Sequence, residues 1–177
     1  MNLIDHDHNF WGRQNTLDVL RKRMSGLKEG YRQNIALLGS RYIGKTSILQ
    51  KLIAEHDDRD IFILYLDLES RDFIHFARQF TKSLLYYYLK SEGQPVQEDL
   101  ALLCAFCKGT IPQTVAVVET IREQLSAGKI TETYAALLSL PDTFCAESKK
   151  AVVLIFDEFH NLDNFAINRA VERLQQI

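Results

Sequence analysis

The chain has 177 residues, enough for one domain with a substantial hydrophobic core. Its formal net charge of -2 gives no electrostatic reason for the whole chain to bind nucleic acid, and no apolar run approaches the roughly 20 residues that a membrane span needs. Because the first residues lack a signal-peptide pattern and three cysteines fit a reducing compartment, we expect a cytoplasmic protein that makes no contact with membranes.

The first predicted element is a helix that follows residues 10–13, Phe-Trp-Gly-Arg. Asn15 or Thr16 is the expected N-terminal cap, because short polar side chains accept hydrogen bonds from the first helical amides. Three apolar residues recur at three- and four-residue steps and predict one buried face: Leu17, Leu20 and Met24.

A short apolar run at 34–38, Asn-Ile-Ala-Leu-Leu, predicts a buried strand, and apolar residues from Ile48 onward recur at helical spacing. Between them, residues 39–47 match G-x-x-x-x-G-K-[ST], the phosphate-binding loop of nucleotide hydrolases. A plain glycine turn is the alternative interpretation. The strand–loop–helix context, with Lys-Thr directly after the second glycine, favours the phosphate loop.

The residue types of this loop each have a physical role. Glycine allows the backbone to turn its amides toward phosphate oxygens, Lys45 supplies a cation for the terminal phosphates, and the Thr46 hydroxyl can bind Mg²⁺. The helix that starts here adds the positive end of its dipole. The residues predicted to bind nucleotide are Gly39, Ser40, Arg41, Tyr42, Ile43, Gly44, Lys45, Thr46 and Ser47.

Residues 61–67, Ile-Phe-Ile-Leu-Tyr-Leu-Asp, predict a second strand that is apolar on both faces, as in a parallel sheet. Ser70 is the expected cap of the next helix. The tyrosines at 86–88 suggest base stacking, but neighbours on a helix point in different directions, so packing is the favoured interpretation. The buried stripe of this helix is predicted to be Phe73, Phe76, Ala77, Phe80, Leu84 and Tyr88.

Residues 93–148 predict helices without a strand, and we interpret them as an all-helical insertion over one face of the sheet. One helix spans 98–107, and its lone Cys104-x-x-Cys107 pair is read as two buried thiols, since no further zinc ligands accompany it. Thr110 is expected to cap the next helix, and a third near 131–140 is expected to end at Pro141.

Residues 151–158 predict a buried strand that ends in two carboxylates, Asp157 and Glu158. Ligands of parallel sheets bind at the carboxyl ends of strands. Asp157 is therefore a candidate to hold Mg²⁺, and Glu158 a candidate general base for water attack on the γ-phosphate. Two acids that simply end a strand in solvent are the alternative. Their place in the chain after a phosphate loop favours the catalytic interpretation.

Together, residues 10–13, 39–47 and 154–159 resemble AAA+-like P-loop ATPases, in particular the prokaryotic archaeal-type group related to STAND signalling ATPases. This resemblance covers residues 9–68 and 150–165. It implies a three-layer α/β/α parallel sheet, with a core at 9–68 and 150–177 inside one domain, 1–177. It also implies ATP and Mg²⁺ as cofactors, through the Walker A loop and the Walker B strand.

The resemblance also implies residue roles. Lys45 and Glu158 would be catalytic, Thr46 and Asp157 would hold the metal, and Arg13 would lie near the adenine. Two positions depart from the family pattern without removing a catalytic group. Gln14 and Asn15 stand where an acidic pair is usual, and Tyr42 replaces a second arginine in the loop.

The family places a further strand between the phosphate-loop strand and the Asp-Glu strand, followed by an arginine finger and a helical lid. None of these follows residue 158, so we expect the sequence to belong to a longer protein and the sheet to be incomplete. The alternatives are that the two strands pair directly, or that a partner supplies the missing one.

The leading functional prediction is an ATPase that couples hydrolysis to a conformational change, with a homo-oligomer as a candidate assembly. The alternative is a switch that binds ATP or ADP without hydrolysis and controls a protein or DNA partner. A phosphotransferase ranks lower, because adjacent Asp and Glu favour water as the nucleophile. A helical interaction module remains a fourth hypothesis, for which the mixed charge of residues 93–148 specifies no partner.

Overall fold

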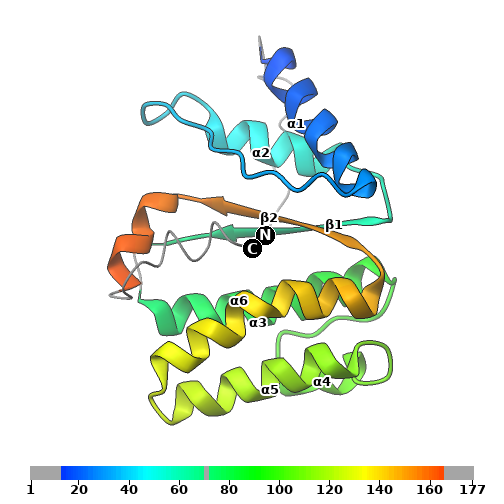
Figure 1. Cartoon of the computed structure of the whole chain (residues 1–177), viewed down its shortest axis with the longest axis vertical. Coiled ribbons are helices and arrows are strands. Elements are labelled where there is room, and N and C mark those ends of the chain that lie inside the picture. The colour runs from blue at the N-terminus through cyan, green and yellow to red at the C-terminus, as the bar shows by residue number, and fades with distance from the viewer. Residues whose placement is uncertain (1–12, 70–71, 166–177) are drawn as a thin grey trace. The chain divides into compact units, whose positions relative to one another are not determined.

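The computed structural model describes residues 13–69 and 72–165. The chain divides into two compact units, Met1–Asp58 and Arg59–Ile177 (Figure 1). Two features of the sequence analysis lie outside the described residues: residues 10–12 of the family resemblance and the predicted cap at Ser70.

The first unit begins with helix α1, Gln14–Gly26, which continues into the short 3-10 helix η1 at Leu27–Glu29. Gly30 then turns the chain with a φ of 85°, a left-handed conformation that glycine adopts without steric cost. The predicted apolar face of α1 is confirmed by three buried residues: Leu17, Leu20 and Met24.

The predicted cap of α1 is wrong. The helix begins at Gln14, so Asn15 and Thr16 lie inside its first turn, and no side chain caps the helix at Arg13. The Arg13 carbonyl instead accepts bonds from the amides of Thr16 at 3.1 Å and Leu17 at 3.2 Å. The helix therefore starts two to three residues earlier than a cap at Asn15 or Thr16 would have placed it.

The predicted strand at 34–38 is also wrong, because these residues carry no regular secondary structure. Ile35 keeps 48% and Leu38 keeps 89% of its accessible surface. A strand is stable only when a neighbour satisfies its backbone groups, and within the described chain the only sheet is formed by two strands of the second unit. The phosphate loop is therefore preceded here by an irregular segment.

Helix α2, Lys45–Ala54, follows the phosphate loop as predicted. Its buried residues, Ile48 and Leu52, lie four apart and form the face that packs within the first unit, where α2 contacts α1. An ion pair between Arg21 of α1 and Glu55 joins the two helices at the end of α2. The first unit is thus a pair of helices that carries the loop between them.

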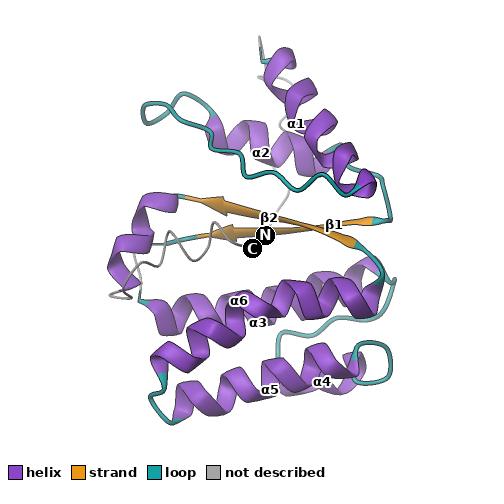
Figure 2. Ribbon diagram, viewed as in Figure 1, coloured by secondary structure: helices purple, strands orange, loops and turns teal. Residues whose placement is uncertain are grey.

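The second unit is built on a parallel pair of strands, β1 at Ile61–Asp67 and β2 at Ala151–Asp157 (Figure 2). Both predicted strands are confirmed. The register pairs Ile61 with Ala151 at one end and Asp67 with Asp157 at the other. Because the strands are parallel and in register, both acidic residues lie at the same edge of the sheet.

The connection between the strands consists of helices, as predicted. Helices α3, Phe73–Ser91, and α6, Ile130–Ser148, contact the sheet, while α4, Leu100–Cys107, and α5, Pro112–Ser126, form a layer beyond them (Figure 1). Helices of the second unit thus cover one face of its sheet. The three-layer arrangement and the status of residues 93–148 as an insertion stay predictions.

The core of the second unit lies between the sheet and these helices. Alternate residues of β1, namely Phe62, Leu64 and Leu66, are buried in it, as expected when side chains alternate across a strand. Phe144 of α6 packs on Phe62 with ring centroids 4.9 Å apart, and on Tyr88 at 5.4 Å. The tyrosine at 88 therefore packs inward, which confirms that residues 86–88 form no stacking platform.

The lone cysteine pair is buried in the same core. Cys104 and Cys107 of α4 are free thiols, as predicted. Burial is the main cause that raises the pKa of the Cys107 thiol to about 12. Both groups therefore behave as small apolar side chains at neutral pH.

Two helix boundaries in this region differ from the sequence predictions. Helix α6 continues through Pro141 to Ser148, because burial of Pro141 and Phe144 in the core outweighs the loss of one backbone bond. Thr110 does not cap α5, since its hydroxyl donates to the Cys107 carbonyl instead. The helix begins at Pro112, a residue that suits a first helical position.

The cap of α5 comes from Glu147, a residue distant in sequence on α6. Its carboxylate accepts the amide of Gln113 at 2.7 Å, the amide of Thr114 at 2.6 Å and the Thr114 hydroxyl at 2.7 Å. Burial alone would raise the pKa of Glu147, but these hydrogen bonds outweigh it and lower the pKa below its ordinary value of 4.5. The contact ties α6 to the start of α5.

We expect Glu147→Gln to destabilise the protein by about 1 kcal/mol at pH 7, the usual worth of a helix cap. Because the folded-state pKa is lowered, this stabilisation is present above pH 4.5 and is lost as the pH falls through the lower folded value. Urea unfolding of both proteins from pH 3 to pH 7 would measure it. Glu98→Gln, at a highly exposed glutamate outside the helices, is the control, and a difference that persisted unchanged at pH 3 would contradict the role of the charge.

Candidate functional site

The phosphate loop lies in the first unit, and two of its residues have a left-handed backbone, one of them at a glycine of the motif. Gly44 adopts a φ of 85° and Tyr42 a φ of 63°, both left-handed. A Cβ added at Gly39 would overlap the Ile43 side chain, so the first glycine allows the loop to close on itself. The Tyr42 side chain is 99% exposed. The loop is therefore tightly curled, with its variable side chains directed to solvent.

Lys45 lies inside the curl of this loop. Its Nζ donates hydrogen bonds to the carbonyls of Gly39 at 2.8 Å and Ser40 at 2.9 Å. The ammonium group is thus held by neutral acceptors of the loop's own backbone. A phosphate oxygen carries a charge and would be a stronger acceptor for the same group.

The N-terminus of α2 is the third part of the loop. Gly44 is its N-cap, and no side chain caps the helix there. Thr46 and Ser47 lie in its first turn, where helix amides and the positive end of the dipole favour an anion. Arg13, the predicted neighbour of the adenine, precedes the loop in the sequence and is the N-cap residue of α1.

The carboxyl ends of the strands form the second part of the candidate site, in the second unit. Asp157 is 8% exposed, and its Oδ2 accepts a hydrogen bond from the Tyr65 hydroxyl at 2.9 Å. Its Oδ1 accepts the amide of Glu158, also at 2.9 Å. Asp157 is therefore oriented by a donor from each strand end.

Two residues near Asp157 were not predicted from the sequence to belong to the site. Asp67 is its register partner on β1, and Tyr65 lies on the same sheet face two residues earlier. Burial is the main cause that raises the pKa of the Asp67 carboxyl, and neighbouring carboxylates, Asp157 first among them, add to it. The sequence did hold a signal for Asp67, because this acid ends a predicted strand just as Asp157 does. For Tyr65 the sequence held none.

Tyr65 remains a hydrogen-bond donor at physiological pH. Burial, followed by the hydrogen bond to Asp157, raises the pKa of its hydroxyl well above the ordinary value of 10.0. The proton is consequently retained by the phenol, and the carboxylate of Asp157 is the acceptor of the pair.

Glu158 follows the strand in an unusual conformation. Its φ is 51°, the left-handed region that costs a non-glycine residue about 1 kcal/mol or more. The Asn161 amide donates to the Glu158 carbonyl at 2.9 Å and closes the turn. Its Oε2 lies 3.4 Å from Nδ1 of His160. The turn thus directs the Glu158 side chain away from the strand and into solvent contact.

The donor set at this edge suits Mg²⁺, which prefers oxygen ligands and keeps several waters. A carboxylate offers about four lone-pair positions, which is more than the phenol and the amide occupy at Asp157. Among the described residues no group of three or more His, Cys, Asp or Glu forms a complete metal cage.

Comparison with known proteins places these features in a family. Residues 9–176 match a family model described as the AAA ATPase domain. This chain belongs to the AAA ATPase domain family. No curated protein and no solved structure gives a significant match.

Membership of the AAA ATPase domain family supports ATP binding and hydrolysis as the general activity. The match includes the phosphate loop of the first unit and the Asp-Glu turn of the second. A small parallel sheet joined by helices is compatible with the AAA fold. No helix in the described part of the domain is long and apolar enough to cross a membrane. The archaeal-type and STAND subgroup stays a prediction.

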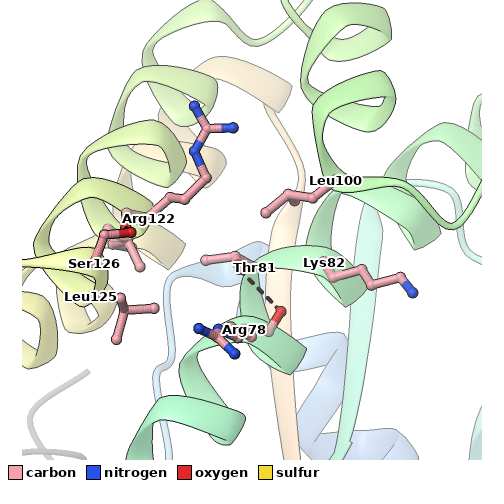
Figure 3. Close-up of a pocket in the computed structure, with 8 residues that line it drawn as sticks. Arg78, Thr81, Lys82, Leu100, Arg122, Leu125 and Ser126 are labelled. Carbon is pink, nitrogen blue, oxygen red and sulfur yellow. Dashed lines mark hydrogen bonds between the residues drawn. The ribbon is translucent and has the colours of Figure 1, made fainter.

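A separate pocket of about 280 Å³ lies among α3, α4 and α5 of the AAA ATPase domain (Figure 3). The charged ends of Arg78, Lys82 and Arg122 point in different directions, and Lys82 pairs with Glu98 at 3.2 Å. Because these cations do not converge, they form no common anion site. The pocket is lined by Arg78, Thr81, Lys82, Leu100, Ile121, Arg122, Leu125 and Ser126.

Proposed function

We propose that this AAA ATPase domain binds ATP together with Mg²⁺, hydrolyses the γ-phosphate bond and couples hydrolysis to a conformational change. The observation that carries the proposal is the family match over residues 9–176, which includes both the phosphate loop and the Asp157–Glu158 turn. That both act on one nucleotide is supported by their order in the chain and by the family. The conformational coupling is the least direct part of the proposal.

In this proposal Lys45 leaves the carbonyls of Gly39 and Ser40 and binds the terminal phosphates. Support comes from the curled loop, in which the ammonium group of Lys45 is bound by the neutral carbonyls of Gly39 and Ser40. The loop amides and the start of α2 would bind the other phosphate oxygens. Arg13 as a neighbour of the adenine stays a prediction.

Thr46 and Asp157 are the proposed Mg²⁺ residues, Thr46 through its hydroxyl and Asp157 through a water. The metal would neutralise charge that develops on the phosphates during transfer. The supporting observation is the orientation of Asp157 by two donors, which hold its carboxylate in one position.

Glu158 is the proposed general base that orients the attacking water and accepts its proton. Its left-handed backbone supports a functional role, because strained conformations persist where the surrounding turn imposes them. The Glu158 side chain is exposed, whereas Asp157 is largely buried. The two acids thus have separate tasks, one on the metal and one on the water.

Coupling is tested by comparing nucleotide states. We expect the release of phosphate from ATP to require Mg²⁺. We also expect the amides of the phosphate loop and the Asp-Glu turn to exchange hydrogen at different rates with ADP and with a non-hydrolysable ATP analogue. Identical exchange in both states would refute the coupling. Binding without phosphate release would favour the alternative, a switch that controls a protein or DNA partner. A homo-oligomer would be detected by light scattering as an increase in molar mass when ATP is added.

A further inference from the structure

The hydrogen bond between Tyr65 and Asp157 joins residues 92 positions apart in the sequence. The bond runs diagonally from β1 to the last residue of β2. The register pairs Tyr65 with Ile155, so Asp157 lies two positions further along the neighbouring strand. Tyr65 contributes nothing to the main core cluster between the sheet and the helices. Its hydroxyl instead donates to Asp157 at the end of the neighbouring strand.

Asp157 is held from two sides by groups of different origin. The Glu158 amide belongs to the turn that follows the strand, whereas the Tyr65 hydroxyl belongs to the neighbouring strand. A carboxylate turns freely about its terminal bond unless both oxygens are engaged. With one donor on each oxygen, the plane of the Asp157 carboxylate is defined.

Neighbouring acidic side chains give the Asp157 carboxylate a reason to be held in place. Asp67 and Glu158 are carboxylates beside Asp157, and each would repel it. A neutral donor is well suited to such a place, since a cation would compete with a metal for the same carboxylate. Tyr65 supplies a donor without a charge.

We propose that Tyr65 is a positioning residue that orients Asp157 toward the Mg²⁺ of bound ATP. The inference rests on the proposed function, in which Asp157 contributes to the metal site. Partners that orient metal-binding carboxylates commonly change metal affinity by about 10- to 100-fold when they are removed. Tyr65 contacts neither nucleotide nor metal in this scheme and acts through Asp157 alone.

The test is the variant Tyr65→Phe, which keeps the ring and removes the hydroxyl. Binding of a fluorescent ATP analogue is measured in EDTA and then along a Mg²⁺ titration, and Mn²⁺ binding in the presence of the analogue is counted by electron paramagnetic resonance. We expect unchanged analogue affinity in EDTA and about a 10-fold higher Mg²⁺ concentration for half-saturation. The same shift is expected for Mn²⁺.

Tyr87→Phe is the matched control, because Tyr87 lies in the same unit with 39% of its surface exposed and contacts Tyr86 rather than an acid. It should leave both titrations unchanged. In an Asp157→Asn background, Tyr65→Phe should shift the Mg²⁺ titration no further, since the two residues act through one contact. This double-mutant cycle compares differences between variants, so it does not depend on the absolute stability of any one of them.

The outcomes separate the inference from the function on which it rests. If the wild type binds the analogue more tightly with Mg²⁺ and Tyr65→Phe responds at the same concentration, the positioning role is overturned and the ATPase proposal stands. An independent shift in the Asp157→Asn background also overturns it. If Mg²⁺ has no effect on nucleotide binding by the wild type, the proposed metal site and the inference both fall.

Discussion

Lys45→Ala is expected to abolish nucleotide binding. The ammonium group is the cation at the centre of the phosphate loop, and its loss would leave phosphate charge without its main partner. Removing one member of a close charge pair commonly costs about 2 to 5 kcal/mol, which corresponds to a dissociation constant at least about 30-fold higher. Equilibrium titration with a fluorescent ATP analogue, in the presence of Mg²⁺, measures the change.

Lys22→Ala is the control for a general charge effect, because Lys22 is exposed on α1 of the same unit. It should bind the analogue like the wild type. The hydrogen bonds of Lys45 join it to two carbonyls of its own loop, so Lys45→Ala should melt at a similar temperature. Nucleotide affinity that survives the substitution would mean that the loop is not the phosphate site.

Glu158→Gln is expected to keep nucleotide binding and to lose turnover. Glutamine preserves the size of the side chain but cannot accept the proton of the attacking water. General-base catalysis is commonly worth about 100- to 10,000-fold in rate, so phosphate release should fall by that factor. Single-turnover hydrolysis together with analogue binding separates the two effects.

Glu98→Gln provides the matched control, since Glu98 is an exposed glutamate of the same unit that pairs with Lys82. Its hydrolysis rate should match the wild type. Equal rates in the wild type and Glu158→Gln would refute the general-base role. Loss of both binding and turnover would instead place Glu158 in nucleotide binding.

Part of the fold was predictable because the signal is local. The strands at 61–67 and 151–157 are short, continuous apolar runs that end in an acid, and both are present. The apolar face of α1 and the burial of Cys104 and Cys107 were predictable from helical spacing. These features depend on neighbours within one turn or one strand.

Other features were predicted wrongly because the deciding partner is remote. The run at 34–38 has the composition of a strand but lacks a neighbour within the described chain. Thr110 has the spacing of a cap, yet Glu147 of α6 binds the first amides of α5. Pro141 has the character of a helix end, but core packing around Phe144 continues the helix. Tertiary contacts override local preference in each case.

The sequence by itself determined the phosphate loop, the Asp157–Glu158 pair and the membership of the AAA ATPase family, because these are carried by residue types at fixed spacing. Only the tertiary structure decided which residues surround Asp157. Parallel pairing of β1 with β2 brings Tyr65 and Asp67 beside it, and a shift of one residue in that register would turn their side chains to the opposite face.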